Sequence, residues 1–129
     1  MPYLNLDDDY PDHPKVEALT DPAFRLHTAA MTFCAKFTTD GFISPSQASK
    51  RTTTYRPRLL TELIDGGLWH DQGDGCGTKT CPPGRAGFYL LHDYLQWNKS
   101  KDWWEKKRRK DAERLANWRA SQAGGDGRV

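Results

Sequence analysis

Two histidines and two cysteines stand at a spacing that could hold a metal ion. Two thiolates and two imidazoles form a donor set that suits zinc in tetrahedral structural sites. The spacing, H-x5-C-x4-C-x10-H, is not the short C-x2-C of common zinc knuckles, so free thiols and a Cys76–Cys81 disulfide are alternatives. One structural zinc is thus one of three interpretations, and its role would be to order a long loop. Its candidate ligands are His70, Cys76, Cys81 and His92.

The loop that carries the cysteines lies between two extended segments. Residues 71–86 (DQGDGCGTKTCPPGRA) are rich in glycine and proline, whereas residues 68–70 and 88–91 favour strands. We therefore expect a hairpin with a long tip. If Leu68 pairs with Leu91, the two histidines lie about 10 Å apart along the ladder, and His92 reaches the site only if the loop folds back.

The most regular helical pattern begins at Thr20-Asp21-Pro22, a cap residue followed by proline in the first turn. Cys34 flanks its apolar stripe and is expected to pack in the core, whereas His27 lies off the stripe and is expected at the surface. The predicted buried face consists of Leu26, Ala30, Phe33 and Phe37.

Two short helices with a basic, threonine-rich turn follow. Ser44 with Pro45 starts the first, and Pro57 starts the second, which ends at Gly66-Gly67. A helix-turn-helix with cations at the mouth of its second helix is how proteins present a helix to DNA, although a helical core with ordinary surface charges is the alternative. The predicted DNA contacts here are Lys50, Arg51, Thr54, Tyr55, Arg56, Arg58 and Thr61.

The predicted order is helix, short strand, helix, helix, strand, long loop, strand. This order indicates an α+β, mostly helical fold, a winged helix-turn-helix whose wing is the 71–86 loop. Lys79 and Arg85 are the cations that this wing could offer to phosphates.

A basic helix is predicted after Ser100, over residues 101–121, as an addition to the winged helix. Three interpretations are open: a clamp on DNA phosphates, a homodimer contact through Trp104, Leu115 and Trp118, or a solvated helix. The density of the basic block favours the clamp. The clamp residues are Lys106, Lys107, Arg108, Arg109 and Lys110.

Length and charge place these segments in one domain with tails. The chain has 129 residues, 36% hydrophobic and 28% charged, with a net charge of +2. Residues 1–14 form an acidic arm expected to be irregular, residues 15–97 the winged-helix domain, residues 98–121 the basic helix and residues 122–129 a disordered tail. The acidic start contains no apolar run, so no signal peptide or membrane span is predicted and a cytoplasmic location with reduced cysteines is expected.

Several stretches resemble a known family. The segments PDHPKVEALTDPAFRLH, TDGFI, LIDGGLW and HDYLQWN, followed by a basic helix, are similar to small winged-helix proteins of actinobacterial phages and prophages. These in turn resemble the N-terminal domains of phage replication-initiation, or replisome-organiser, proteins. The resemblance covers about residues 11–115, and it implies a winged helix that binds nucleic acid inside the bacterial host cell, in replication or gene regulation. Relatives keep a cysteine pair in the loop.

The sequence contains no set of residues that would support catalysis, so we do not expect an enzyme. The expected partner is double-stranded DNA, and a replication or transcription protein is a further expected partner. The alternative function is a winged helix used as a protein-docking adaptor. Salt separates the two, because phosphate contacts weaken steeply with salt whereas an apolar interface does not.

Overall fold

Prolines mark the starts of four helices in the computed structural model, which describes residues 2–126. These helices are α1 (Pro14–Glu17), α2 (Asp21–Phe37), α3 (Pro45–Ser49) and α4 (Pro57–Asp65). The Ser44 hydroxyl accepts a hydrogen bond from the Gln47 N–H at 3.2 Å, so the predicted cap of α3 is confirmed. The other helices are the 3-10 helix η1 (Tyr10–Asp12), α5 (Tyr94–Trp97) and α6 (Lys101–Asp126).

Three short strands form an antiparallel sheet in the order β1-β3-β2, namely β1 (Phe42–Ile43), β2 (Trp69–His70) and β3 (Tyr89–Leu91). Trp69 lies opposite Leu91, and His70 lies opposite Leu90. The pairing of Leu68 with Leu91 is therefore wrong by one residue. Because a slip of one residue moves a side chain to the other face of a sheet, this difference decides which side chains His70 can meet.

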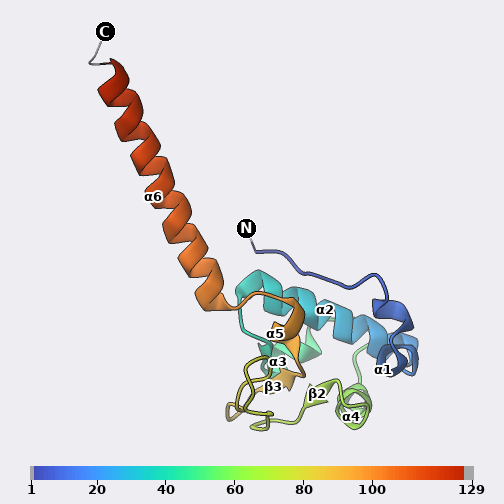
Figure 1. Ribbon diagram of the computed structural model, residues 1–129. Helices are drawn as coiled ribbons and strands as arrows, with labels where there is room; N and C mark the ends of the chain where they lie inside the picture. The colour runs from blue at the N-terminus through green and yellow to red at the C-terminus, as the bar shows by residue number, and fades with distance from the viewer. Residues whose placement is uncertain (1, 127–129) are drawn as a thin grey trace.

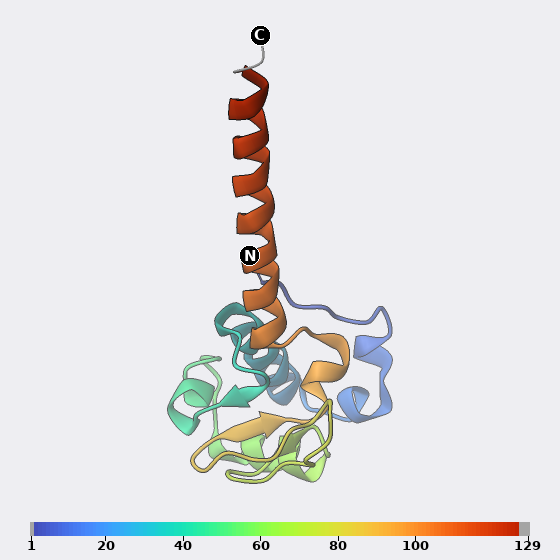
Figure 2. The same cartoon turned by 60° about the vertical axis from the view of Figure 1, so that its left-hand side comes forward.

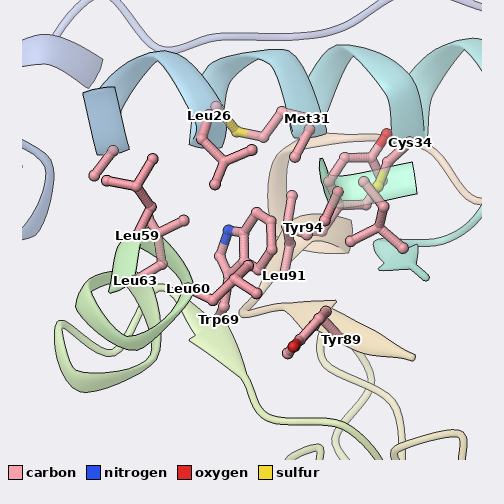
Figure 3. Close-up of a cluster of buried hydrophobic side chains, with 14 residues drawn as sticks. Leu26, Met31, Cys34, Leu59, Leu60, Leu63, Trp69, Tyr89, Leu91 and Tyr94 are labelled. Carbon is pink, nitrogen blue, oxygen red and sulfur yellow. The ribbon is translucent and has the colours of Figure 1, made fainter. Parts of the chain in front are cut away.

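One face of the sheet carries the main hydrophobic core. Figure 3 shows Trp69 of β2 between the leucines of α4 and the side chains of α2, with Leu91 of β3 beside it. Leu26 and Ala30 of α2 are fully buried there, as predicted. Phe33 is only partly buried, and Phe37 is 55% exposed. The prediction that Phe33 and Phe37 are buried is therefore only partly right for Phe33 and wrong for Phe37, since the last turn of α2 extends past the buried cluster.

His27 is buried, so its predicted surface position is wrong. Its Nδ1 accepts a hydrogen bond from the Trp69 indole N–H at 2.9 Å. A buried indole needs an acceptor, and this need explains a polar residue in the core. Burial lowers the pKa of His27 to about 4. Cys34 is a core residue as predicted, and burial raises the pKa of its thiol to about 12.

The acidic arm lies on the domain and is anchored at both its ends. The Asn5 N–H donates to the Asn98 side-chain oxygen at 2.8 Å, and the Tyr3 ring packs edge-on against Trp104. Tyr10 donates or accepts a hydrogen bond with Thr28 of α2. The arm also contains η1, so it is less irregular than expected.

Helix α6 leaves the domain and extends away from every other element (Figures 1 and 2). It continues to Asp126, past Ser121, so the prediction of a disordered tail from residue 122 is wrong up to that point. Residues 127–129 lie outside the described part. Among residues 2–126, no helix combines the length and the apolar character that crossing a membrane would require.

Candidate metal centre and cationic surfaces

The structure brings the four predicted ligands together. Their ligand atoms all lie within 4.8 Å of one another. The Nε2 of His70 is 3.0 Å from the Nδ1 of His92 and 3.3 Å from the Sγ of Cys76. The Sγ of Cys81 lies 3.2 Å from His70 Nε2 and 3.6 Å from His92 Nδ1.

These distances suit one tetrahedral ion. Bonds of about 2.0–2.1 Å to nitrogen and about 2.3 Å to sulfur give tetrahedral edges of about 3.3 Å between two nitrogens and about 3.6 Å between nitrogen and sulfur. The observed separations of 3.0 Å and of 3.2 to 3.6 Å are close to these edges. The cysteines are not joined in a disulfide. The four side chains therefore form a candidate metal centre with two sulfur and two nitrogen donors.

The register of the hairpin places both histidines on the same side. His70 faces Leu90, and His92 lies two residues further along the other segment, so the two side chains are diagonal neighbours on one face. The His92 N–H donates to the Leu68 carbonyl at 2.8 Å, which continues the pairing past β3. The expected separation of about 10 Å followed from the wrong register.

The cysteine loop folds back over the second face of the sheet. Cys81 is fully buried there with Phe42 and Leu90, and Phe88 packs against them. The two halves of the loop approach each other closely. A Cβ at Gly84 would collide with the backbone of Gly73, so this position requires glycine. This close approach brings the two halves of the loop together, and Cys81 lies within 3.6 Å of both histidines.

A tight turn between the two cysteines positions Cys81. The Thr78 N–H donates to the Cys81 carbonyl at 2.7 Å, and the Thr78 hydroxyl oxygen accepts from the Cys81 N–H at 3.1 Å. Cys76, by contrast, is exposed. One thiol is therefore held inside the small cluster, and the other closes the site from the solvent side.

Asp93 supports the candidate centre from outside the ligand set. One of its carboxylate oxygens lies 3.2 Å from the Nε2 of His92, the ring nitrogen that does not face the cysteines. The other oxygen accepts a hydrogen bond from the Thr80 hydroxyl at 3.1 Å. A carboxylate behind a ligating histidine fixes the ring and its tautomer. Asp93 adopts a left-handed φ of 52°, which lets it turn back towards His92.

The protonation of the site suits a metal ligand set. Desolvation lowers the pKa of His70, and the neighbouring His92 lowers it further, so the His70 imidazole is neutral near pH 7. The neighbouring Cys81 thiol raises the pKa of Cys76. A metal ion must therefore displace the thiol protons, which makes its binding weaker in acid.

The cations around α4 divide into two groups. Arg51 is engaged by the protein itself, because its side chain donates to Gln47 twice and its guanidinium lies over the Phe33 ring at 4.6 Å. Tyr55 is half-buried against the main core. The predicted contacts that remain exposed on this side are Lys50, Thr54, Arg56, Arg58 and Thr61.

Glu62 has a structural role that sequence reasoning missed. Its two carboxylate oxygens accept hydrogen bonds from the Thr20 N–H at 2.7 Å and from the Thr20 hydroxyl at 2.9 Å. Glu62 therefore ties α4 to the first turn of α2. A pairing of Glu62 with Thr20 has no signal in the sequence, because the two residues are 42 positions apart.

The two wing cations also differ. The Arg85 guanidinium lies over the Phe42 ring at 4.4 Å and near the Phe88 ring at 5.4 Å, so it covers the small cluster under the loop. Lys79 is exposed between the two cysteines. Of the two predicted wing contacts, only Lys79 is free of such packing.

The basic block of α6 is exposed throughout. Lys106 pairs with Asp102 at 3.0 Å, and Lys107 pairs with Asp111 at 3.4 Å. Within residues 2–126, no ion pair engages Arg108, Arg109 or Lys110, and none joins the acidic arm to this block. Trp104 is buried at the base of α6, whereas Leu115 and Trp118 are exposed. Of the three residues predicted to form a homodimer contact, only Leu115 and Trp118 are exposed for it.

Comparisons with known proteins identified no relative. No family model, no curated protein and no solved structure matches this chain.

Proposed function

We propose that this protein is a winged-helix, DNA-binding protein whose wing is held by zinc. The observation that carries the proposal is the uncovered outer side of α4. Its inner face is buried through Leu59, Leu60 and Leu63, while Arg56 and Arg58 stand exposed at its start. A helix presented in this way can enter a DNA groove with cations placed for the phosphates.

The order of elements supports the winged-helix interpretation. A helix, a short strand, two helices and a hairpin follow one another, and the first strand joins the sheet beside the last one, in the order β1-β3-β2. The loop of the hairpin then takes the place of the wing. Lys79, in the middle of that loop, is exposed and supplies a cation there.

Zinc is the ion that the candidate centre fits best. Thiolate and imidazole donors in a tetrahedral arrangement are typical of structural zinc sites, and hard ions such as magnesium or calcium require oxygen ligands. His70, Cys76, Cys81 and His92 would hold the ion, which would bind the loop to the sheet. The role is structural, since all four tetrahedral positions are taken by side chains.

The test of DNA binding is fluorescence anisotropy with a random-sequence duplex at about 50 and about 200 mM salt, a range over which phosphate-driven binding falls by orders of magnitude. We expect micromolar binding at the lower concentration and its collapse at the higher one. The variant R56Q/R58Q should bind more weakly with unchanged thermal stability, and S46A/S49A, on the neighbouring α3, is the matched control. Absence of binding at low salt would refute the proposal.

A protein-docking adaptor is the second candidate. The observation in its favour is that two tryptophans are exposed, Trp97 of α5 at 59% and Trp118 of α6 at 57%. Exposed tryptophans are typical anchors of protein interfaces. If DNA binding is absent, a partner captured through these residues should be lost in W97A/W118A and should tolerate high salt.

The resemblance to winged-helix proteins of actinobacterial phages supports the proposal that the DNA binding serves replication initiation or gene regulation. A footprint of the protein on phage DNA would distinguish a replication origin from a promoter. We expect protection at one of these two kinds of site.

A further inference from the structure

The helices α4 and α6, which carry most of the exposed cations, are attached at opposite ends of α2. Glu62 of α4 binds Thr20 at the first turn of α2, whereas the N–H of Lys101, where α6 begins, donates to Asp40, just after the last turn of α2. A helix of 17 residues spans about 25 Å, so the two attachment points are well separated. In both views, α6 extends upward from the domain, while α4 and the 71–86 loop lie at the bottom (Figures 1 and 2).

The separation matters because α6 points away from the α4 side. Its 26 residues give it a length of about 39 Å, and its basic block lies beyond the buried Trp104, clear of the domain. A duplex on the outer side of α4 would have to turn around the domain to meet this block. Bending DNA by 40–90° over 20–30 base pairs already costs about 1–6 kcal/mol, and such a path requires a larger turn.

Both surfaces nevertheless carry exposed cations that can bind phosphates. On the α4 side, Arg56, Arg58 and Lys79 are exposed, and none of them forms an ion pair among the described residues. On α6, Arg108, Arg109 and Lys110 are exposed and equally without an acidic partner in residues 2–126. Each surface can therefore release counterions from a polyanion independently of the other.

We propose that one chain binds two separate segments of double-stranded DNA, one on the side of α4 and the wing and one along α6, and thereby bridges them. This inference rests on the proposed DNA-binding function and adds the number and arrangement of the duplexes. The bridge needs both surfaces in the same chain and does not need a second copy of the protein.

The test is a bridging assay with the 129-residue chain. One duplex is immobilised, a second duplex of different random sequence carries a fluorophore, and the retained fluorescence is measured at about 50 mM salt. We expect the protein to retain the second duplex. Two variants each remove one surface: R56Q/R58Q/K79Q on the α4 side, and K106Q/K107Q/R108Q/R109Q/K110Q on α6. With each variant the retained fluorescence should fall at least about tenfold, while anisotropy still detects binding of a single duplex.

The two variants also distinguish a bridge within one chain from a bridge between two copies. If dimers held the two duplexes, each variant would still bridge through its remaining surface on both copies. Undiminished retention by both variants would therefore overturn the proposal, and so would a wild-type protein that binds one duplex and retains no second. A wild-type protein that binds no duplex at all would instead refute the proposed function itself. Substitution of exposed residues by glutamine, a good helix former, should leave the circular dichroism spectrum unchanged.

Discussion

Acid should lower the free energy of unfolding of this protein, because His27 is buried in its neutral form. The side chain is buried and neutral, and its pKa is lowered to about 4 by burial. An unfolded chain would protonate the same imidazole near pH 6.5. Between these two values the unfolded state binds more protons than the folded state, so stability falls as the pH falls. The contribution of neutral His27 is fully present above about pH 6.5 and is lost as the pH falls through about 4.

The size of the effect follows from the same two values. A difference of about 2.5 pKa units corresponds to about 3 kcal/mol in total, and at pH 5 about 2 kcal/mol of it is already lost. For a protein of this size such a loss is a large part of the free energy of unfolding. It is specific to His27, because the proton would have to break the hydrogen bond that Nδ1 accepts from Trp69.

The assay is urea unfolding, followed by tryptophan fluorescence, at pH 8, 6 and 5. His27→Gln keeps an acceptor for the Trp69 N–H but has no group that titrates in this range. We expect the variant to lose about 2 kcal/mol less than the wild type between pH 8 and pH 5. Every other side chain is the same in both proteins, so its contribution cancels in the comparison. His13→Gln, at an exposed position, is the control. Equal pH dependence in the wild type and His27→Gln would refute this account of the buried histidine.

Three further predictions concern the candidate metal centre, the contact between α4 and α2, and the two cations of the wing. Native mass spectrometry should find one zinc per chain, and Cys81→Ser should abolish it whereas Cys34→Ala should not; a metal-free wild type would contradict the zinc proposal. Glu62→Gln should lower the free energy of unfolding by about 1 kcal/mol, since it weakens the tie to Thr20, and it should leave DNA affinity unchanged; a loss of affinity without a loss of stability would show that Glu62 contacts DNA. Arg85→Gln should lower thermal stability because Arg85 covers Phe42 and Phe88, whereas Lys79→Gln should lower DNA affinity only; the reverse pattern would exclude this division of the wing.

The local signals in the sequence predicted most of the elements. Proline and capping residues located the starts of α2, α3 and α4, and the glycine pair located the end of α4. These signals act within a few residues, so they can be read without knowing the fold. The four metal ligands could also be selected, because the cysteines and histidines are few and lie close together along the chain.

Contacts between distant segments could not be predicted in the same way. The strand register depends on which of two adjacent apolar residues faces α2, and in strands of two and three residues the pattern does not distinguish the alternatives. His27 appeared exposed because its partner Trp69 is far away in the sequence. The packing of Arg51 and Arg85 on aromatic rings also depends on tertiary structure, since a sequence shows only their charge.

The two faces of the small sheet differ in the size of the hydrophobic cluster that packs on each. The main core joins fourteen buried residues, whereas the cluster under the cysteine loop joins three. Local opening should therefore begin in the loop, with the helices still closed, because the free energy of opening a segment depends on the contacts that it alone makes. Release of the metal would then be a local event, and amide hydrogen exchange would rise in residues 71–86 long before it rises in α2. We therefore expect the loop on one face of the sheet to open while the helices on the other face stay packed.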